Sequence, residues 1–377
     1  MQKLITLTIC FFSISFSFSQ DSTKVLKLMF VGDVMGHSPQ INSAYDSATK
    51  TFNYDSVFSR VKSVFSLADY VVANLEVTLA GEPYKGYPQF SSPDELVDGL
   101  VNSGVNVIVN ANNHSVDRGG SGIKRTIEVL NAKGIPHTGT FLDSIDRVTH
   151  NPLIVEKYGI KLALLNYTYG TNGLVVPAPY IVNYIDTLKM GQDINTAKSL
   201  GVDDIVVFIH WGNEYERTPS TAQRWLAGWL HGKGVRIVIG SHPHVIQRME
   251  ATFDTDSTNG NVTVYSLGNF VSNQRKRYCD GGVLAYLELA KPDSGQSKIV
   301  NAGYIPVWVR TPYKNGRKKY QVLPVSEYEN AARFNAAEDS SFTTFTTDTR
   351  TLLNSQNVNF PEIKFIDGNW IIPAANR

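Results

Sequence analysis

Cysteine is scarce in this sequence. Among 377 residues only Cys10 and Cys279 are cysteines, and Cys10 lies in an apolar stretch at the N-terminus. If that stretch is removed, Cys279 has no partner within the chain, so no internal disulfide can form. A core of this size needs no disulfide for its stability. A metal site would therefore use histidine, aspartate, asparagine and glutamate rather than thiolates.

An excess of charge of one sign is also missing. The chain has 35 Lys and Arg against 34 Asp and Glu, and its net charge is +1. Nucleic-acid-binding proteins usually have a basic excess, so we expect no nucleic-acid partner. A polyanion would have to bind to local patches of positive charge. No run beyond the N-terminus is long and apolar enough to span a membrane. Hydrophobic residues make up 42% and charged residues 18% of the chain, which indicates a globular protein with a substantial core.

The N-terminal stretch has the features of a signal peptide. Lys3 is the only charged side chain before Asp21, and the residues between them are apolar with a few serines. The small residues Ser17 and Ser19 place cleavage after Ser19. We therefore expect an exported protein, periplasmic or extracellular. The alternative is an N-terminal membrane anchor, for which the stretch is short, since a span needs roughly 20 residues.

Apolar strand patterns alternate with helical ones through most of the chain. We expect strands at 25–31, 69–74, 105–109, 161–167, 204–210 and 235–239, and helices at 93–102, 120–132 and 221–231. In the last of these helices, Trp225, Leu226 and Trp229 are expected to face inward. From Val245 onward the pattern is β-rich. It predicts a mixed sheet, or two facing sheets, with helices outside. We assign residues 25–310 to one domain and residues 311–377 to a C-terminal extension that is partly β.

Five polar clusters follow predicted apolar strands. They are GDVMGH at 32–37, NLE at 74–76, ANNHSVD at 111–117, HWGNE at 210–214 and GSHPH at 240–244, and they contain five of the eight histidines. In folds of this class, ligands bind where strands end. Imidazole, carboxylate and amide oxygen suit Zn, Mn or Fe, and two such metals can clamp a phosphoryl oxygen and activate a water.

Each cluster taken alone also has a purely structural interpretation. Asp33 could cap a helix, the two asparagines at 112–113 could form a turn, and His210 could be a hydrogen-bonded structural residue. His242 and His244 are better candidates for joint ligation. They occupy alternate positions, which point the same way if the segment is extended, and Pro243 favours an extended residue before it.

Six strings occur in the order typical of one bacterial family. FVGDVMGH, NLEVTLAG, ANNHSVDRG, HWGNEY, GSHPHV and YSLGNFV run from Phe30 to Val271. In these strings the chain resembles the CapA family of capsule and poly-γ-glutamate biosynthesis, which in turn resembles calcineurin-like metallophosphoesterases. The resemblance implies an α/β sandwich of two facing mixed sheets flanked by helices, in four layers. It also implies a metal-dependent hydrolase or transferase that acts on an anionic polymer or a phosphoester, with membrane-bound capsule synthesis proteins as partners.

The resemblance assigns roles to individual residues. The expected ligands of one or two divalent transition metals (Mn, Zn or Fe) are Asp33, Asn74, Glu76, Asn113, His210, His242 and His244. His114 is expected to act on the leaving group, and Asp117 is a further catalytic candidate. Glu214 could be an acid, a base or a substrate contact, or a buried carboxylate tied to arginine or backbone. Asn273, Gln274 and Arg275 could line a pocket for an anionic substrate, or form a surface loop.

The sequence departs from the phosphoesterase pattern in two places. Met35 stands where a histidine is usual, and His37 could replace that histidine only if the loop bends back. The segment that should bridge two metals is altered to Asn-Leu-Glu, ending at Glu76. A single metal, or a cleft that binds polymer without catalysis, is therefore compatible with the same residues.

Overall fold

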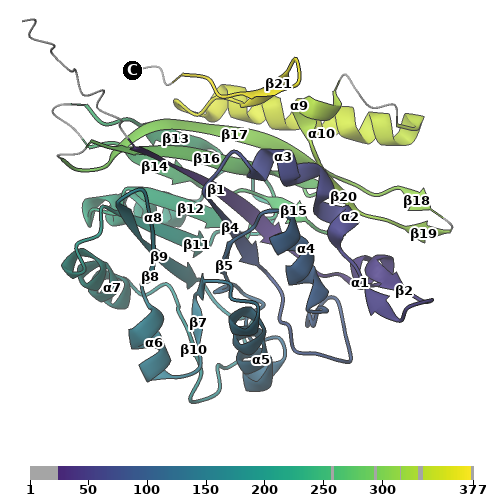
Figure 1. Cartoon of the computed structure of the whole chain (residues 1–377), viewed down its shortest axis with the longest axis horizontal. Helices are drawn as coiled ribbons and strands as arrows, with labels where there is room; N and C mark the ends of the chain where they lie inside the picture. The colour runs from purple at the N-terminus through teal and green to yellow at the C-terminus, as the bar shows by residue number, and fades with distance from the viewer. Residues whose placement is uncertain (1–23, 256–258, 293–294, 315, 330–333, 375–377) are drawn as a thin grey trace, which may run out of the picture.

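Two β-sheets face each other in the computed structural model, which describes residues 24–255, 259–292, 295–314, 316–329 and 334–374 (Figure 1). One sheet has eight strands in the order β20-β17-β16-β1-β4-β5-β6, with β15 also paired to β1. The other has six, in the order β13-β14-β12-β11-β9-β8. Both contain parallel and antiparallel pairs, so the expected sandwich of two facing mixed sheets is confirmed. The signal peptide expected at residues 1–19 lies outside the described residues.

The eight-stranded sheet brings several strand ends to one edge. Its strands are β1 (Lys24–Val34), β4 (Tyr70–Leu75), β5 (Val107–Val109), β6 (His137–Thr138), β15 (Asn269–Val271), β16 (Gly281–Lys291), β17 (Lys298–Arg310) and β20 (Gln321–Pro324). The strands β4, β5 and β15 belong to a parallel set with β1, whereas β16 runs antiparallel to it. The carboxyl ends of β1, β4, β5 and β15 therefore meet at the same edge.

The six-stranded sheet, on the opposite side, also brings several strand ends to one edge. Its strands are β8 (Leu153–Lys157), β9 (Ile160–Thr168), β11 (Asp204–His210), β12 (Ile237–Ser241), β13 (Met249–Thr252) and β14 (Asn261–Val264). The strands β9, β11, β12 and β14 are parallel, and His210 at the end of β11 is aligned with Ser241 at the end of β12.

Helices cover the outer face of each sheet. The helices are α1 (Ser38–Ala44), α2 (Asp55–Phe58), η1 (Ser59–Val61), α3 (Lys62–Phe65), α4 (Glu95–Ser103), α5 (Gly119–Ala132), α6 (Ser144–His150), α7 (Thr187–Ser199), α8 (Thr221–Gly232), α9 (Val325–Tyr328) and α10 (Ala336–Gln356). Four short pairs complete the fold: β2 (Tyr45–Asp46) with β3 (Thr51–Phe52), β7 (Thr140–Phe141) with β10 (Ile181–Val182), β18 (Tyr313–Lys314) with β19 (Arg317–Lys318), and β21 (Lys364–Ile366) with β22 (Asn369–Ile371). Helices α2 to α4 pack on the eight-stranded sheet, and α7 and α8 on the six-stranded one.

The main core lies between the sheets. Phe30 of β1 and Phe208 of β11 meet there, with ring centroids 6.5 Å apart. On α8 the inward face consists of Gln223, Leu226, Ala227 and Leu230. The expectation that Trp225 faces inward is wrong, since 60% of it is exposed. It precedes Leu226 by one residue, which is about 100° around the helix.

The C-terminal residues contribute to the same core. The strand β20 extends the eight-stranded sheet by pairing with β17, and it lies in the C-terminal segment that was expected to be partly β. The helix α10, yellow in Figure 1, inserts Phe342, Phe345, Leu352 and Leu353 into the core between the sheets. Sequence patterning did not predict this helix, because Ser and Thr interrupt its apolar face. Among the described residues, no helix combines the length and apolarity that a membrane crossing requires.

Candidate metal centre

Asp33 and Asn74 lie side by side where β1 and β4 end. They are register partners in the parallel pair, and Asn74 Nδ2 donates a hydrogen bond of 2.8 Å to Asp33 Oδ1. The amide oxygen of Asn74 accepts a bond from Asn112 Nδ2 at 3.2 Å. Both ends of the Asn74 amide are thus used within the protein. In this arrangement Asn74 orients the Asp33 carboxylate toward the facing sheet.

The histidines come from the six-stranded sheet. His210 is the last residue of β11, whereas His242 and His244 follow β12, which ends at Ser241. The extended conformation expected for this pair is wrong: His242 has φ of 99° and His244 φ of 57°. Both values lie in the left-handed region, which is costly for a residue with a β-carbon. A tight turn, rather than strand alternation, directs both rings to the same place.

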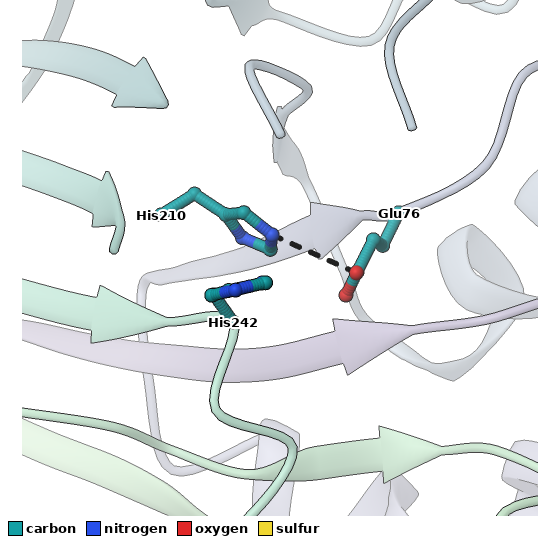
Figure 2. A group of neighbouring side chains, drawn as sticks. All are labelled: Glu76, His210 and His242. Atoms are coloured by element: carbon teal, nitrogen blue, oxygen red, sulfur yellow. Dashed lines mark ion pairs between the residues drawn. The ribbon is translucent and has the colours of Figure 1, made fainter. Parts of the chain in front are cut away.

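These side chains converge on Glu76. Oε1 of Glu76 lies 3.6 Å from Nε2 of His210 and 3.8 Å from Nε2 of His244. Figure 2 shows the rings of His210 and His242 directed toward the Glu76 carboxylate from the opposite side. Two groups of donor atoms each lie within 4.8 Å of one another: Glu76 with His210 and His242, and Asp33 with Glu76 and His244. Glu76 belongs to both groups, so its carboxylate could contribute a ligand to each.

The electrostatics of Glu76 favour a bound cation. Its side chain is completely buried, and within the described part of the chain neither carboxylate oxygen has a hydrogen-bond partner. Burial, and then the nearby charge of Asp33, raise the pKa of Glu76 well above its usual value. An unpaired buried carboxylate is costly, and a metal ion would remove that cost. The residues therefore fit a divalent cation between Glu76 and the histidines.

The histidines are held in the form that binds metal. Burial lowers the pKa of His242 to about 3 and lowers that of His210 well below its ordinary value. Both rings are thus neutral near pH 7, as metal ligation requires. Within the described residues, Nδ1 of His242 is buried and has no hydrogen-bond partner. Like the oxygens of Glu76, this nitrogen is therefore a potential metal-ligating atom that has no hydrogen-bond partner within the described residues.

Asn113 adds an amide oxygen to the same group. Its Oδ1 lies 2.8 Å from Nε2 of His210. Two ligands of one transition metal, each bonded at about 2.0–2.2 Å, lie on the order of 3 Å apart. The spacing therefore suits joint ligation of one ion. Nδ2 of Asn113 donates to Asn172 at 3.2 Å, which fixes the orientation of the amide.

His114 and Asp117 form a buried pair beside the metal ligands. Nδ1 of His114 lies 2.7 Å from Oδ2 of Asp117, which also accepts a bond from the backbone N–H of Phe90 at 2.7 Å. The His114 ring packs edge-on against Phe90, with centroids 4.7 Å apart. Asp117 thus sets the tautomer and orientation of the imidazole. In this arrangement Nε2 of the histidine is free to deliver a proton or to accept one.

The other candidate residues lie outside the two donor groups. Glu214 is exposed, so its interpretation as a buried carboxylate is wrong. Met35 is buried in the apolar cluster beneath α2 to α4. His37 caps α1 and its Nδ1 lies 3.1 Å from Gln40 Oε1, so the loop does not place it among the donor atoms.

The sequence comparison agrees with this geometry. A family model described as "Bacterial capsule synthesis protein PGA_cap" matches residues 27–274, a span that contains both donor groups. This chain belongs to the PGA_cap family. A match of this extent covers the strand ends of both sheets, so the family assignment applies to the whole candidate centre.

Two relatives of this PGA_cap family member are named as biosynthesis proteins for PGA or capsule. It is 28% identical over 298 residues to the PGA biosynthesis protein CapA of Bacillus subtilis (strain 168), covering 74% of this chain and 71% of that protein. It is 30% identical over 265 residues to the capsule biosynthesis protein CapA of Bacillus anthracis, covering 66% of this chain and 60% of that protein. Among solved structures, a 5'-nucleotidase from Candida albicans SC5314 is similar at 12% identity and a TM-score of 0.40, over 86% of this chain and 57% of that one. Such a TM-score is too low to bear on activity.

Two polar residues of this PGA_cap domain had no role assigned from sequence. Oγ of Ser241 lies 2.9 Å from Nδ1 of His210, and Oδ1 of Asn269 lies 3.1 Å from Nδ1 of His244. Both contacts fix the ring of a candidate ligand, as supporting residues around metals usually do. Their strings, GSHPHV and YSLGNFV, were visible in the sequence. The parallel pairing of β15 with β1, which brings Asn269 beside Asp33, was not.

Proposed function

We propose that this protein is an exported, metal-dependent hydrolase or transferase of the phosphoesterase type, acting in the biosynthesis of capsule or poly-γ-glutamate. Its substrate would be a phosphoester or an anionic cell-surface polymer. The observation that carries the proposal is the completely buried Glu76, whose carboxylate has no hydrogen-bond partner among the described residues and lies close to His210, His244 and Asp33.

The donor set indicates which metals would bind. Asp33, Glu76 and His244 would hold one ion, and Glu76, Asn113, His210 and His242 the other. Oxygen and imidazole ligands without thiolates suit Mn, Zn or Fe. Bound there, such metals would supply a polarising charge for a phosphoryl oxygen and a more acidic water. His114, held by Asp117, would protonate the leaving group from Nε2.

Export and partners belong to the same proposal. The apolar N-terminal stretch with small residues before position 20 supports a signal peptide, with an N-terminal anchor as the alternative. The names of the two CapA relatives support a role in making a polymer at the cell surface. Membrane-bound synthesis proteins are then the natural partners.

Metal content tests the proposal most directly. We would measure transition metals per chain by elemental mass spectrometry in protein purified without chelator. About two ions per chain are expected, and fewer in His242→Ala/His244→Ala. The matched control is His137→Ala/His150→Ala, which removes two histidines outside the centre. A folded wild-type protein that holds no metal and takes up neither Mn nor Zn would contradict the proposal.

A second candidate function has its own supporting observation. Met35 occupies the usual position of a histidine and is buried in an apolar cluster, so the centre has one ligand fewer than the phosphoesterase pattern. We propose as the alternative a non-catalytic component that binds polymer in the same cleft. A metal-loaded protein that binds a γ-linked glutamate oligomer yet hydrolyses no phosphomonoester or phosphodiester would favour it.

A further inference from the structure

A separate pocket of about 260 Å³ lies between the loops beside the metal centre and the helix α10. Three arginines and two aspartates line it: Arg217, Arg275, Arg277, Asp280 and Asp348. We call it the arginine pocket. The hydroxyl-bearing residues Ser340, Ser341 and Thr344 of α10 complete its wall.

Among the described residues, two of the three guanidinium groups form no ion pair at salt-bridge distance, although the charge of Asp280 acts on Arg275. Arg217 donates from Nη2 to the backbone oxygen of Asp348 at 2.8 Å, and its buried Nε has no partner among the described residues. Arg275 donates to the backbone oxygens of Gln274 and Val309, each at 2.8 Å. Within the described ranges, neither arginine forms an ion pair. A buried guanidinium N–H that is left unsatisfied costs free energy until an acceptor arrives.

The third arginine is neutralised, which leaves the pocket with an uncompensated positive charge. Arg277 forms a two-pronged ion pair with Asp348, at 2.8 and 2.9 Å. Asp280 accepts a bond from Trp308 Nε1 at 3.1 Å, and burial raises the pKa of its carboxyl group. Three guanidinium groups against two carboxylates leave one net positive charge. The pocket is therefore suited to one anionic group.

Tyr278 holds two of the arginines in place. The guanidinium carbon of Arg217 lies 4.0 Å from the centroid of the Tyr278 ring, and that of Arg277 lies 5.3 Å from it. Stacking on an aromatic ring orients a planar guanidinium while leaving its N–H groups free for a ligand. A guanidinium held in this way binds the two oxygens of a carboxylate or phosphate side by side.

The chain connects this pocket to the metal centre. The loop that follows His210 leads to Arg217, the turn at His244 leads to Ile246 in the pocket wall, and the strand that begins at Asn269 leads to Arg275. The Nζ atom of Lys276 also lies 4.2 Å from the centroid of the Tyr215 ring, between these loops. Asn269, whose Oδ1 lies 3.1 Å from Nδ1 of His244, also donates from Nδ2 to the backbone oxygen of Cys279 at 2.8 Å, and Cys279 stands between Tyr278 and Asp280 of the pocket lining. A chain-like ligand held at the centre would thus have the pocket as its neighbour.

We propose that the arginine pocket binds one oxyanion group, a carboxylate or a phosphate, of a ligand outside the metal centre. The guanidinium group of Arg217, which forms no ion pair within the described residues, provides the principal contact. This binding requires no metal, so it stands or falls independently of the proposed catalysis.

The test is calorimetric titration of the full, metal-loaded protein with two probes, inorganic phosphate and a synthetic γ-linked glutamate oligomer. In Arg217→Met, which removes charged hydrogen bonds, Kd should rise about tenfold or more. Arg217→Lys, which keeps the charge but loses the planar fork, should give a smaller rise. The control Lys233→Met makes the same change in charge at another cation that lies over an aromatic ring, Trp229, and should leave Kd unchanged. His242→Ala/His244→Ala should also retain binding.

Each result of the titrations either supports or contradicts the proposed anion site. Binding of phosphate alone would identify a phosphorylated ligand. Binding of the oligomer alone would identify a carboxylate ligand. Either result supports the proposal if Arg217→Met weakens the binding. Unchanged Kd in folded Arg217→Met would overturn the proposal, as would no binding of either probe to the wild-type protein. Binding that is lost only with the histidine pair would assign the anion to the metal centre instead. If Arg217→Met does not fold, an unchanged Kd in Arg217→Lys would count against the pocket.

Discussion

Oδ2 of Asp33 lies 3.1 Å from Nδ1 of His244, although 211 residues separate the two in the chain. Asp33 lies next to the end of β1 in one sheet, and His244 lies in a turn after β12 of the other. Their contact exists only because the sheets pack face to face. The candidate centre therefore depends on the core between them, and substitutions in that core should affect metal binding as well as stability.

Glu76→Gln should reduce metal content from about two ions per chain to one or none, because the amide cannot serve as an anionic bridge. In chelated protein the same change should stabilise the fold, since it removes a buried carboxylate whose pKa is raised by burial. Elemental analysis and denaturant unfolding with chelator would check the two effects. Glu128→Gln, at an exposed glutamate on α5, is the control. Unchanged metal content in Glu76→Gln would exclude Glu76 as a bridging ligand.

His114→Ala should strongly reduce turnover of a phosphoester substrate while leaving metal content unchanged. A positioned general acid typically contributes 10²–10⁴-fold to the rate, so a loss of about that size is expected. His150→Ala is a matched control, because His150 Nδ1 also contacts an aspartate, Asp146, at 2.6 Å but on an exposed helix. Retained turnover in His114→Ala would remove the proposed role.

The half-buried His37 should make stability sensitive to mild acid. Burial lowers the pKa of His37 to about 4, whereas an unfolded histidine titrates near 6.5. Between these values the unfolded chain binds a proton that the folded chain does not, so stability is lost as pH falls from about 6.5 toward 4. By linkage the loss is about 2 kcal/mol at pH 5. Denaturant unfolding at about pH 5 and 7.5 should show that His37→Asn removes this part of the difference. An identical pH dependence in wild type and variant would be evidence against it.

Leu353→Ala should destabilise the protein by about 2–5 kcal/mol, because Leu353 of α10 is buried in the core between the sheets. Leu188→Ala, at a leucine that is 72% exposed, should change stability by less than about 0.5 kcal/mol. Urea unfolding of both variants would measure the difference. Equal, small effects would mean that α10 adds little to the core.

Much of the fold could be predicted from local pattern. The strand at 204–210 was placed at its true bounds, and the helix at 221–231 was placed to within one residue. The helix α10 was missed although Asn335 and Glu338 form a capping box at its start, because its apolar residues are separated by Ser and Thr. Trp225 was placed wrongly because large aromatic residues were assumed to face inward. These errors arise where tertiary packing, rather than local sequence, decides which residues are buried.

The sequence by itself determined which residue types stand at the strand ends, and the order of six strings that places the chain in its family. It also identified Glu76 and the three histidines that lie around it, His210, His242 and His244. Only the tertiary structure decided that Glu76 lies between two donor groups, that His242 and His244 converge through a left-handed turn, and that Met35 faces the core. The arginine pocket likewise required the packing of α10 against distant loops. Residue types are local properties, whereas distances between atoms on different sheets are set by how those sheets pack.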